Sequence, residues 1–451
     1  MTSALFPRNF RKTYPEAVRG DGCYIVTAEG RRILDAAGSA AVVSIGHGVA
    51  AVGQAMAEQA QHLAFAHTSQ FQTAIAERLA ARVLALAPPA FRKGGRVYFT
   101  SGGSEATETA LKLARQYFLE RGQPQRVRMV ARWQSYHGST LGAMAVSGNT
   151  RRREKFLPML PDWGHIAPCY CYRCPLGLKY PECDVACADE LEKFVAGVAP
   201  ETVAAFLFEP VVGATLGAVA PPLGTPNYVQ RLADICRRHG ILLIADEVMT
   251  GMGRTGKPFA VEHWGVTPDI ILVGKGIASG YAPLGAVIVA PHVVDAIANG
   301  SAAFDHGFTY QMHPVSMAAS HAVLDVLEER RLFERVAPMG AALLEALAPL
   351  RALPIVGDVR GMGLLIGVEF VRNAATREPF PAEANVAERI RLAALEQGVA
   401  VYPTQGCVDG RAGDHILLAP PFILGNHEIQ EIAQALQYAV TRVAEGRALT
   451  P

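Results

Sequence analysis

The sequence lacks several features that would place it in a specialised class of protein. No apolar run reaches the roughly 18 residues needed to cross a membrane, and the first eight residues lack the charged-then-apolar plan of a signal peptide. Basic and acidic residues number 42 and 41, so the net charge of +1 favours neither nucleic acid nor an anionic membrane surface. Low-complexity tracts and internal repeats are also absent. We therefore expect a cytoplasmic protein of 451 residues that acts on small molecules and has more than one domain.

An acidic residue and a lysine each end a short apolar run. Residues 241–245 lead to Asp246, and residues 270–274 lead to Lys275. Short apolar runs without helical periodicity are typical of buried parallel strands, and ligands of open α/β sheets bind at the carboxyl ends of such strands. A carboxylate and an amine together suit pyridoxal phosphate, which needs an amine for its Schiff base and an acid at its ring nitrogen. The alternative is a buried ion pair with a purely structural role.

A glycine-rich turn upstream predicts a phosphate site. Residues 96–100 have the composition of a strand, residues 101–106 contain two glycines and two serines, and residues 107–119 have apolar positions at helical spacing. This arrangement directs backbone N–H groups and the positive end of a helix at an anion. Most glycine-rich turns are simply turns, so the signal is weak by itself. Farther along, Tyr136 follows an apolar run and suits stacking on a flat ring, with an ordinary core position as the alternative.

Taken in order, these motifs resemble those of the class III (ω-amino acid) aminotransferases, which are pyridoxal-phosphate enzymes of fold type I. The resemblance covers most of the chain, from about residue 14 to residue 444. The motifs that carry it are residues 101–106, Tyr136-His137-Gly138, Glu209-Pro210-Val211, Asp246-Glu247-Val248, Lys275-Gly276, Gly307-Phe308-Thr309-Tyr310, Gly413-Asp414-His415-Ile416 and Ala419-Pro420-Pro421.

The resemblance implies a role for each matching residue. Lys275 would form the Schiff base and carry the proton between substrate and cofactor, and Asp246 would keep the ring nitrogen protonated. Gly103 and Ser104 would bind the phosphate, and Thr309 would reach it from the neighbouring subunit. Val248 and Tyr136 would lie on the two faces of the ring. His137 beside Tyr136 and the supporting acid Glu209 complete the implied cofactor-binding set. The resemblance thus implies a homodimer, or a tetramer that contains it.

The order of segments and the resemblance together predict an α/β protein with the fold of the type I pyridoxal-phosphate transferases. Residues 63–320 alternate strand-like and helix-like segments and carry every cofactor motif, so we expect a large, mostly parallel-sheet domain there. Residues 321–451 would form a smaller α+β domain, which the resemblance completes with residues 1–62.

Five of the eight cysteines fall in one short stretch. Their spacing, CxC-x2-C-x8-C-x3-C, is close to that of zinc sites. The stretch has the composition of a surface insertion, so free thiols are the alternative. We expect no metal in the catalytic chemistry on either interpretation. The five residues are Cys169, Cys171, Cys174, Cys183 and Cys187.

Departures from the family pattern bear on the substrate. Family members that use 2-oxoglutarate often carry an arginine where this chain has Ser139 and a glutamate where it has Ala214. The usual carboxylate-binding arginine near residues 416–418 is also missing. These departures favour pyruvate as the amino acceptor. Arg411 lies near a flexible carboxylate-binding arginine of some members, with a solvated loop residue as the alternative, and Ala41 falls where bulky aromatics often line the pocket and so leaves room for a large donor.

We therefore predict a ping-pong aminotransferase that moves an amino group from an amine or ω-amino acid to a keto acid. The same motifs also serve decarboxylases, aminomutases, racemases or epimerases and phospho-lyases, and an acceptor other than pyruvate stays open. A cofactor-free protein that kept the fold would be expected to lose Lys275 or Asp246, and both are present. A metal-binding module built on the cysteines is the remaining alternative.

Overall fold

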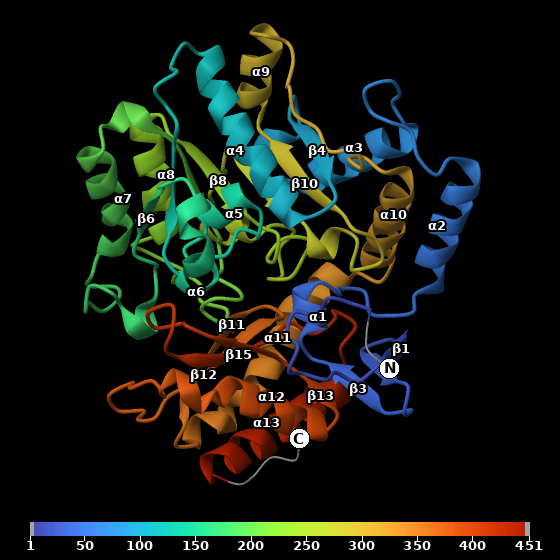
Figure 1. Ribbon diagram of the computed structural model, residues 1–451, viewed down its shortest axis with the longest axis vertical. Coiled ribbons are helices and arrows are strands. Elements are labelled where there is room, and N and C mark those ends of the chain that lie inside the picture. Colours follow the sequence, from blue (N-terminus) through green and yellow to red (C-terminus); the bar gives the residue numbers. More distant parts are fainter. Residues whose placement is uncertain (1–3, 447–451) are drawn as a thin grey trace.

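The computed structural model describes residues 4–446, which form a larger and a smaller lobe (Figure 1). The larger lobe is built on a seven-stranded sheet in the order β4-β10-β9-β8-β7-β5-β6. β10 is antiparallel to both of its neighbours, and every other neighbouring pair is parallel. The strands are β4 (Arg96–Thr100), β5 (Arg128–Arg132), β6 (Gly164–Ile166), β7 (Val203–Phe208), β8 (Leu242–Asp246), β9 (Ile270–Val273) and β10 (Gly285–Val289).

Helices cover both faces of this sheet, which is why its central strands read as continuous apolar runs. Along β8, Leu242 and Ile244 belong to the apolar cluster that contains residues of α4, whereas Leu243 and Ala245 belong to the cluster that contains residues of α8 and α10. The alternation follows from the two-residue period of a strand. The helices of this lobe are α2 (Ala50–His62), α3 (Ala74–Leu86), α4 (Gly103–Glu120), α5 (Leu141–Val146), α6 (Thr150–Arg153), α7 (Ala186–Gly197), α8 (Tyr228–His239), α9 (Pro291–Asn299) and α10 (Pro314–Glu329).

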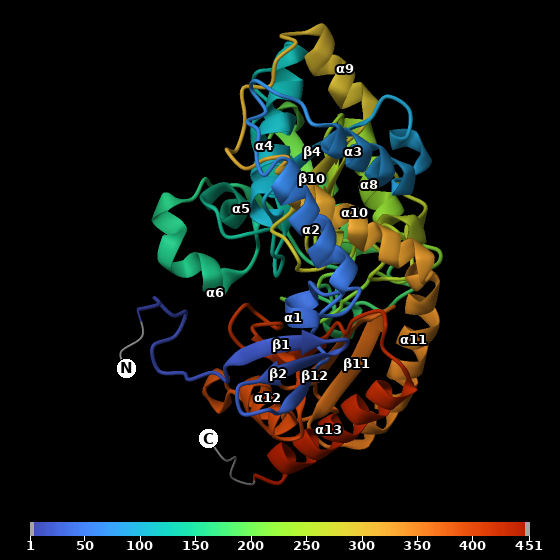
Figure 2. The ribbon, with the colours of Figure 1, turned by 90° about the vertical axis from the view of Figure 1, so that its right-hand side faces the viewer.

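The smaller lobe combines the two ends of the chain (Figure 2). Parallel pairing of β13 with β3 places Val399 opposite Leu34 and so joins a C-terminal segment to an N-terminal one. One sheet has the order β1-β2-β3-β13 and the other β11-β12-β15-β14. The elements are β1 (Ala17–Asp21), β2 (Tyr24–Thr27), β3 (Arg32–Asp35), α1 (Gly38–Ala41), α11 (Leu332–Leu347), β11 (Val356–Met362), β12 (Leu365–Phe370), α12 (Val386–Glu396), β13 (Val399–Ala400), β14 (Tyr402–Gln405), β15 (Asp414–Leu418) and α13 (Asn426–Ala444).

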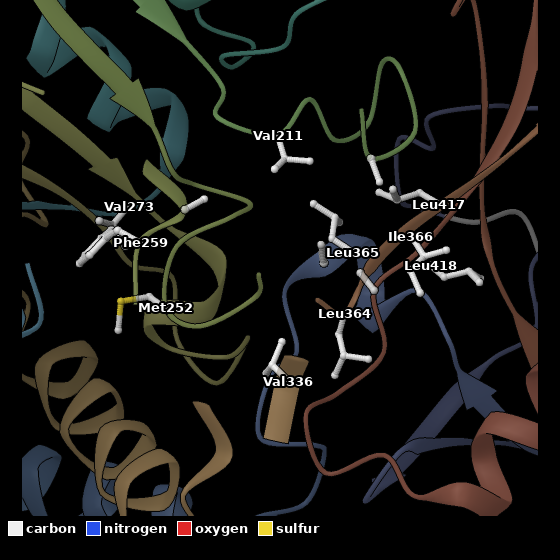
Figure 3. Packing of buried hydrophobic residues seen from close by; sticks show 14 of the residues in the cluster. Val211, Met252, Phe259, Val273, Val336, Leu364, Leu365, Ile366, Leu417 and Leu418 are labelled. Atoms are coloured by element: carbon white, nitrogen blue, oxygen red, sulfur yellow. The ribbon is translucent and has the colours of Figure 1, made fainter. Parts of the chain in front are cut away.

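One hydrophobic cluster continues from the larger lobe into the smaller one. Figure 3 shows residues from both lobes in it, among them Val273 at the end of β9, Leu365 at the start of β12 and Leu418 at the end of β15. Burial of this shared apolar surface holds the two lobes together. Short 3-10 helices complete the structure: η1 (Pro89–Phe91), η2 (Glu154–Met159), η3 (Cys171–Arg173), η4 (Pro200–Thr202), η5 (Ala260–Trp264), η6 (Lys275–Ile277), η7 (Ala348–Ala352) and η8 (Ala382–Ala384).

Two further features can be read from residues 4–446. No helix formed by them combines the length and the apolar character needed to cross a membrane. The seven-stranded sheet with helices on both faces, beside a smaller lobe of mixed sheets and helices, confirms the predicted α/β fold class.

Candidate active site

Asp246 and Lys275 meet in one cavity, at the carboxyl ends of neighbouring strands. β8 ends at Asp246, which lies opposite Leu272 of the parallel strand β9. Two residues after β9 ends, Lys275 begins η6 with a left-handed backbone (φ 44°). Both side chains line a cavity of about 440 Å³. Parallel strand ends converge at one edge of a sheet, so the two apolar runs deliver their terminal polar residues to the same place.

The Asp246 carboxylate is held by two hydrogen bonds. Its Oδ2 atom lies 2.7 Å from Nδ1 of His137, and its Oδ1 atom accepts a bond of 3.0 Å from the backbone N–H of Val248. Only 4% of Asp246 is exposed. Nε2 of His137 is buried and has no hydrogen-bond partner among residues 4–446. The acid is therefore fixed in orientation while it still lines the cavity.

The Lys275 amine is poised to lose its proton near neutral pH. Burial lowers the pKa of Lys275 from 10.5 to about 8, because removal from water disfavours the charged form. The cations of Arg254 and Arg152 act in the same direction, and the carboxylates of Asp246 and Glu209 oppose them. A substantial neutral fraction makes this lysine a competent nucleophile and base.

The start of α4 forms the third side of the cavity. Its first residue, Gly103, lies so close to Val248 that an added Cβ would be 2.9 Å from Val248 Cγ1. Next to it, Ser104 accepts a hydrogen bond of 3.0 Å at Oγ from the backbone N–H of Ser139. The unpaired N–H groups and positive dipole of an 18-residue helix make this end a site for an anion.

Tyr136 and Glu209 form another part of the cavity wall. The backbone N–H of Tyr136 donates to Oε1 of Glu209 over 3.0 Å, and Oε2 accepts from the N–H of Gly213 over 3.2 Å. Through these two bonds the Glu209 side chain holds two backbone segments at the cavity, and burial raises its pKa. The Tyr136 hydroxyl lies 2.9 Å from Oγ of Ser139.

Three residues named from the sequence lie away from the cavity lining. Thr309 is exposed on the loop between α9 and α10. Arg411 is 65% exposed and forms an ion pair of 2.8 Å with Glu154. Ala41 is buried in α1, and it is the next residue, Val42, that lines the cavity. The roles predicted for these three side chains thus stay predictions.

Comparison with known proteins identifies the family. Residues 6–440 match the family described as aminotransferase class III. The chain belongs to the class III aminotransferases. The uncharacterized aminotransferase YodT of Bacillus subtilis is 37% identical over 98% of each chain. An (S)-enantioselective omega-transaminase of Thermomicrobium roseum has a solved structure that is 38% identical, with a TM-score of 0.90 over 98% of this chain and 96% of that one. A PLP-bound amine transaminase from an uncultivated Pseudomonas species is also 38% identical, with a TM-score of 0.90 over 98% and 97% of the two chains.

These comparisons confirm that this class III aminotransferase has the type I transferase fold suggested by its motifs. The family depends on pyridoxal phosphate, and the residues present fit that group. The cavity offers an amine at Lys275, a carboxylate at Asp246 and an anion site at the start of α4. Its volume lies in the range usual for small-molecule sites.

The cysteine-rich segment of the class III aminotransferase lies outside this cavity. The thiol of Cys169 contacts those of Cys171 and Cys187, and all the cysteines are free. Across residues 4–446, no three Cys, His, Asp or Glu side chains are grouped so that they could hold a metal ion. Free thiols and the zinc site that the spacing suggested both stay predictions.

Proposed function

We propose that this class III aminotransferase binds pyridoxal phosphate and moves an amino group from an amine or ω-amino acid to pyruvate by a ping-pong mechanism. The observation that carries the proposal is the convergence of Lys275, Asp246 and the first turn of α4 on one cavity. Each of these groups matches one part of the cofactor: aldehyde, ring nitrogen and phosphate.

The bound cofactor supplies an electron sink for the carbon that loses its proton. Lys275, whose pKa is lowered to about 8, would hold the cofactor through its amine and would carry the proton at the substrate carbon. Asp246, oriented by His137 and by the Val248 N–H, would hold the ring nitrogen. Gly103 and Ser104 would hold the phosphate.

Two side chains flank the ring in this proposal. Val248 reaches the cavity from the segment after β8, close to the start of α4, and Tyr136 reaches it from the segment after β5. Glu209 acts indirectly, because its carboxylate holds the backbone N–H of Tyr136. Loss of that bond would free the Tyr136 segment, which forms part of the cavity wall.

The lining of the cavity supports a monocarboxylate acceptor. 2-Oxoglutarate has a second carboxylate, which would need its own cation when it is removed from water. Among residues 4–446, no arginine lines the cavity, and Ala214 stands in place of the family's gate glutamate. Pyruvate makes the smaller demand and is therefore the acceptor proposed here.

The proposed active form is a homodimer in the cytoplasm, in which Thr309 of one subunit reaches the phosphate bound by the other. Support comes from the surroundings of Thr309. The adjacent Tyr310 is 64% exposed, and its ring lies 5.8 Å from that of Phe65. Exposed aromatic side chains that cluster on a surface mark an interface. Light scattering of the purified protein, together with the cofactor affinity of Thr309→Ala, tests this assembly.

The proposal is tested by the visible absorption spectrum of the purified protein. An ω-amine should bleach the band of the lysine-linked cofactor, and pyruvate should then restore it. Recovery with 2-oxoglutarate alone would show that the acceptor is wrong. A band that persists with every donor would point to another reaction of the same cofactor, such as decarboxylation or racemisation. The absence of any band after pyridoxal phosphate is supplied would contradict cofactor binding itself.

A further inference from the structure

Arg152 is an exposed cation at the edge of the proposed active site. It lies in α6, which stands out from the larger lobe together with α5 (Figure 2). Its guanidinium carbon lies 4.5 Å from the centre of the Tyr136 ring, and Tyr136 lines the cavity. The start of α6 is held in place by Asn149, whose Oδ1 accepts a bond of 3.1 Å from the backbone N–H of Arg152.

The neighbouring arginines contact groups outside the cavity lining, whereas Arg152 contacts Tyr136, which is part of that lining. Arg151 donates to Gln405 over 3.1 Å, Arg153 is buried against Trp133, and Arg411 is paired with Glu154. Within residues 4–446, no carboxylate lies within ion-pair distance of the Arg152 guanidinium. The planar group retains its fork of N–H donors, since contact with an aromatic face uses none of them.

The reaction itself creates a need for such a cation. In a 2-oxo acid the carboxylate is one bond away from the carbon that receives the amino group, so it must lie close to Lys275. A carboxylate removed from water is costly unless it is paired. Among residues 4–446, Lys275 is the one lysine or arginine in the cavity lining, and it is engaged in the chemistry. Burial is the main reason that the pKa of Lys275 is lowered, and the positive charge of Arg152 adds to the effect.

We propose that Arg152 binds the carboxylate of the acid substrate, that is, of the 2-oxo acid acceptor and of the amino acid that it becomes. This inference rests on the proposed transamination and adds the residue that selects an acid. A guanidinium binds a carboxylate through two parallel N–H···O bonds, which also fix its orientation. An amine donor without a carboxylate does not use this contact.

The test compares acceptors with and without a carboxylate. The enzyme is first converted to its amino form with an ω-amine, and the return half-reaction is then followed with pyruvate or with butanal as the probe. Arg152→Gln should lower kcat/KM for pyruvate by about 10- to 100-fold, as expected for loss of a hydrogen bond to a charged group. The effect should fall mainly on KM, and the rate with butanal should stay within about twofold of wild type, because no charged contact is lost with that acceptor.

Two further variants distinguish the effect of the positive charge of Arg152 from the effect of its guanidinium geometry and from a general effect on the structure of α6. Arg152→Lys keeps the charge without the fork and should recover part of the pyruvate activity. Arg151→Gln removes the neighbouring arginine, which faces Gln405, and should behave like wild type with both acceptors. This variant is the matched control for the loss of one positive charge from α6.

Several outcomes would overturn the inference. Equal losses with pyruvate and butanal in Arg152→Gln would show that the residue serves the structure of the site alone. A selective loss of pyruvate activity in Arg411→Gln, with Arg152→Gln unaffected, would move the role to Arg411. If the wild-type enzyme were not restored by any keto acid, the transaminase proposal would fail rather than the assignment of Arg152.

Discussion

Replacing Gly103 with alanine probes the closest contact in the proposed cofactor site. The added Cβ would lie 2.9 Å from Cγ1 and 3.2 Å from Cγ2 of Val248. Contacts this short require either Val248 to move toward the cavity, where it would crowd the ring, or the start of α4 to move away from the phosphate. Overpacking of this kind costs about 1–3 kcal/mol. If that cost falls on the bound state, the dissociation constant for pyridoxal phosphate should rise by about 5- to 150-fold.

A glycine outside the cavity provides the control. Gly197 is exposed at the end of α7, and a Cβ there would have no heavy atom within 4 Å. Gly197→Ala should therefore bind the cofactor as wild type does. The assay is a titration of each apoenzyme with pyridoxal phosphate, with the melting temperature of each apoenzyme measured in parallel. Unchanged affinity in Gly103→Ala, or an equal loss in Gly197→Ala, would refute the argument.

Other predictions follow from the chemistry of the site and from burial. Lys275→Ala should lower turnover by at least about 10³-fold. In the wild type, the rate at which the enzyme links covalently to added cofactor should rise through pH 8, where Lys275 loses its proton. A flat rate profile from pH 7 to 9 would contradict this. Asp246→Asn should fold normally yet turn over about 10²- to 10⁴-fold more slowly, whereas near-normal turnover would exclude its role. Burial lowers the pKa of His415 to about 4, so the unfolded chain binds a proton below pH 6.5 that the folded chain does not, and stability falls as the pH drops from 6.5 to 4. His415→Gln should weaken that dependence in urea unfolding at pH 7 and pH 5, and an unchanged dependence would refute the assignment.

The residues at the ends of buried strands could be predicted from the sequence alone. Asp246 and Lys275 each end an apolar run, and the parallel pairing of β8 with β9 brings such ends to one edge of the sheet. The glycine turn before α4 could also be predicted from the sequence, because a strand, a turn and the start of a helix each have a local sequence pattern. These local signals, read together with the family motifs, indicated the fold, the family and the centre of the site.

The edge of the site has no comparable signal in the sequence. Arg152 is one of three consecutive arginines, and nothing in their spacing indicates that Arg151 faces Gln405 while Arg152 covers Tyr136. Arg411 was predicted from its position along the chain, yet the fold places it beside Glu154 on the surface.

The difference between the predictable centre of the site and its unpredictable edge has a physical reason. The amino-acid sequence determined which elements form and which residues end them, since apolar periodicity and turn chemistry act between residues close in the chain. The tertiary structure decided which side chains from separate loops share the rim of the cavity, because that depends on how α6 and the segment after β14 pack against the larger lobe. Loop side chains follow no period of their own, so their neighbours are set when the elements that carry them are packed.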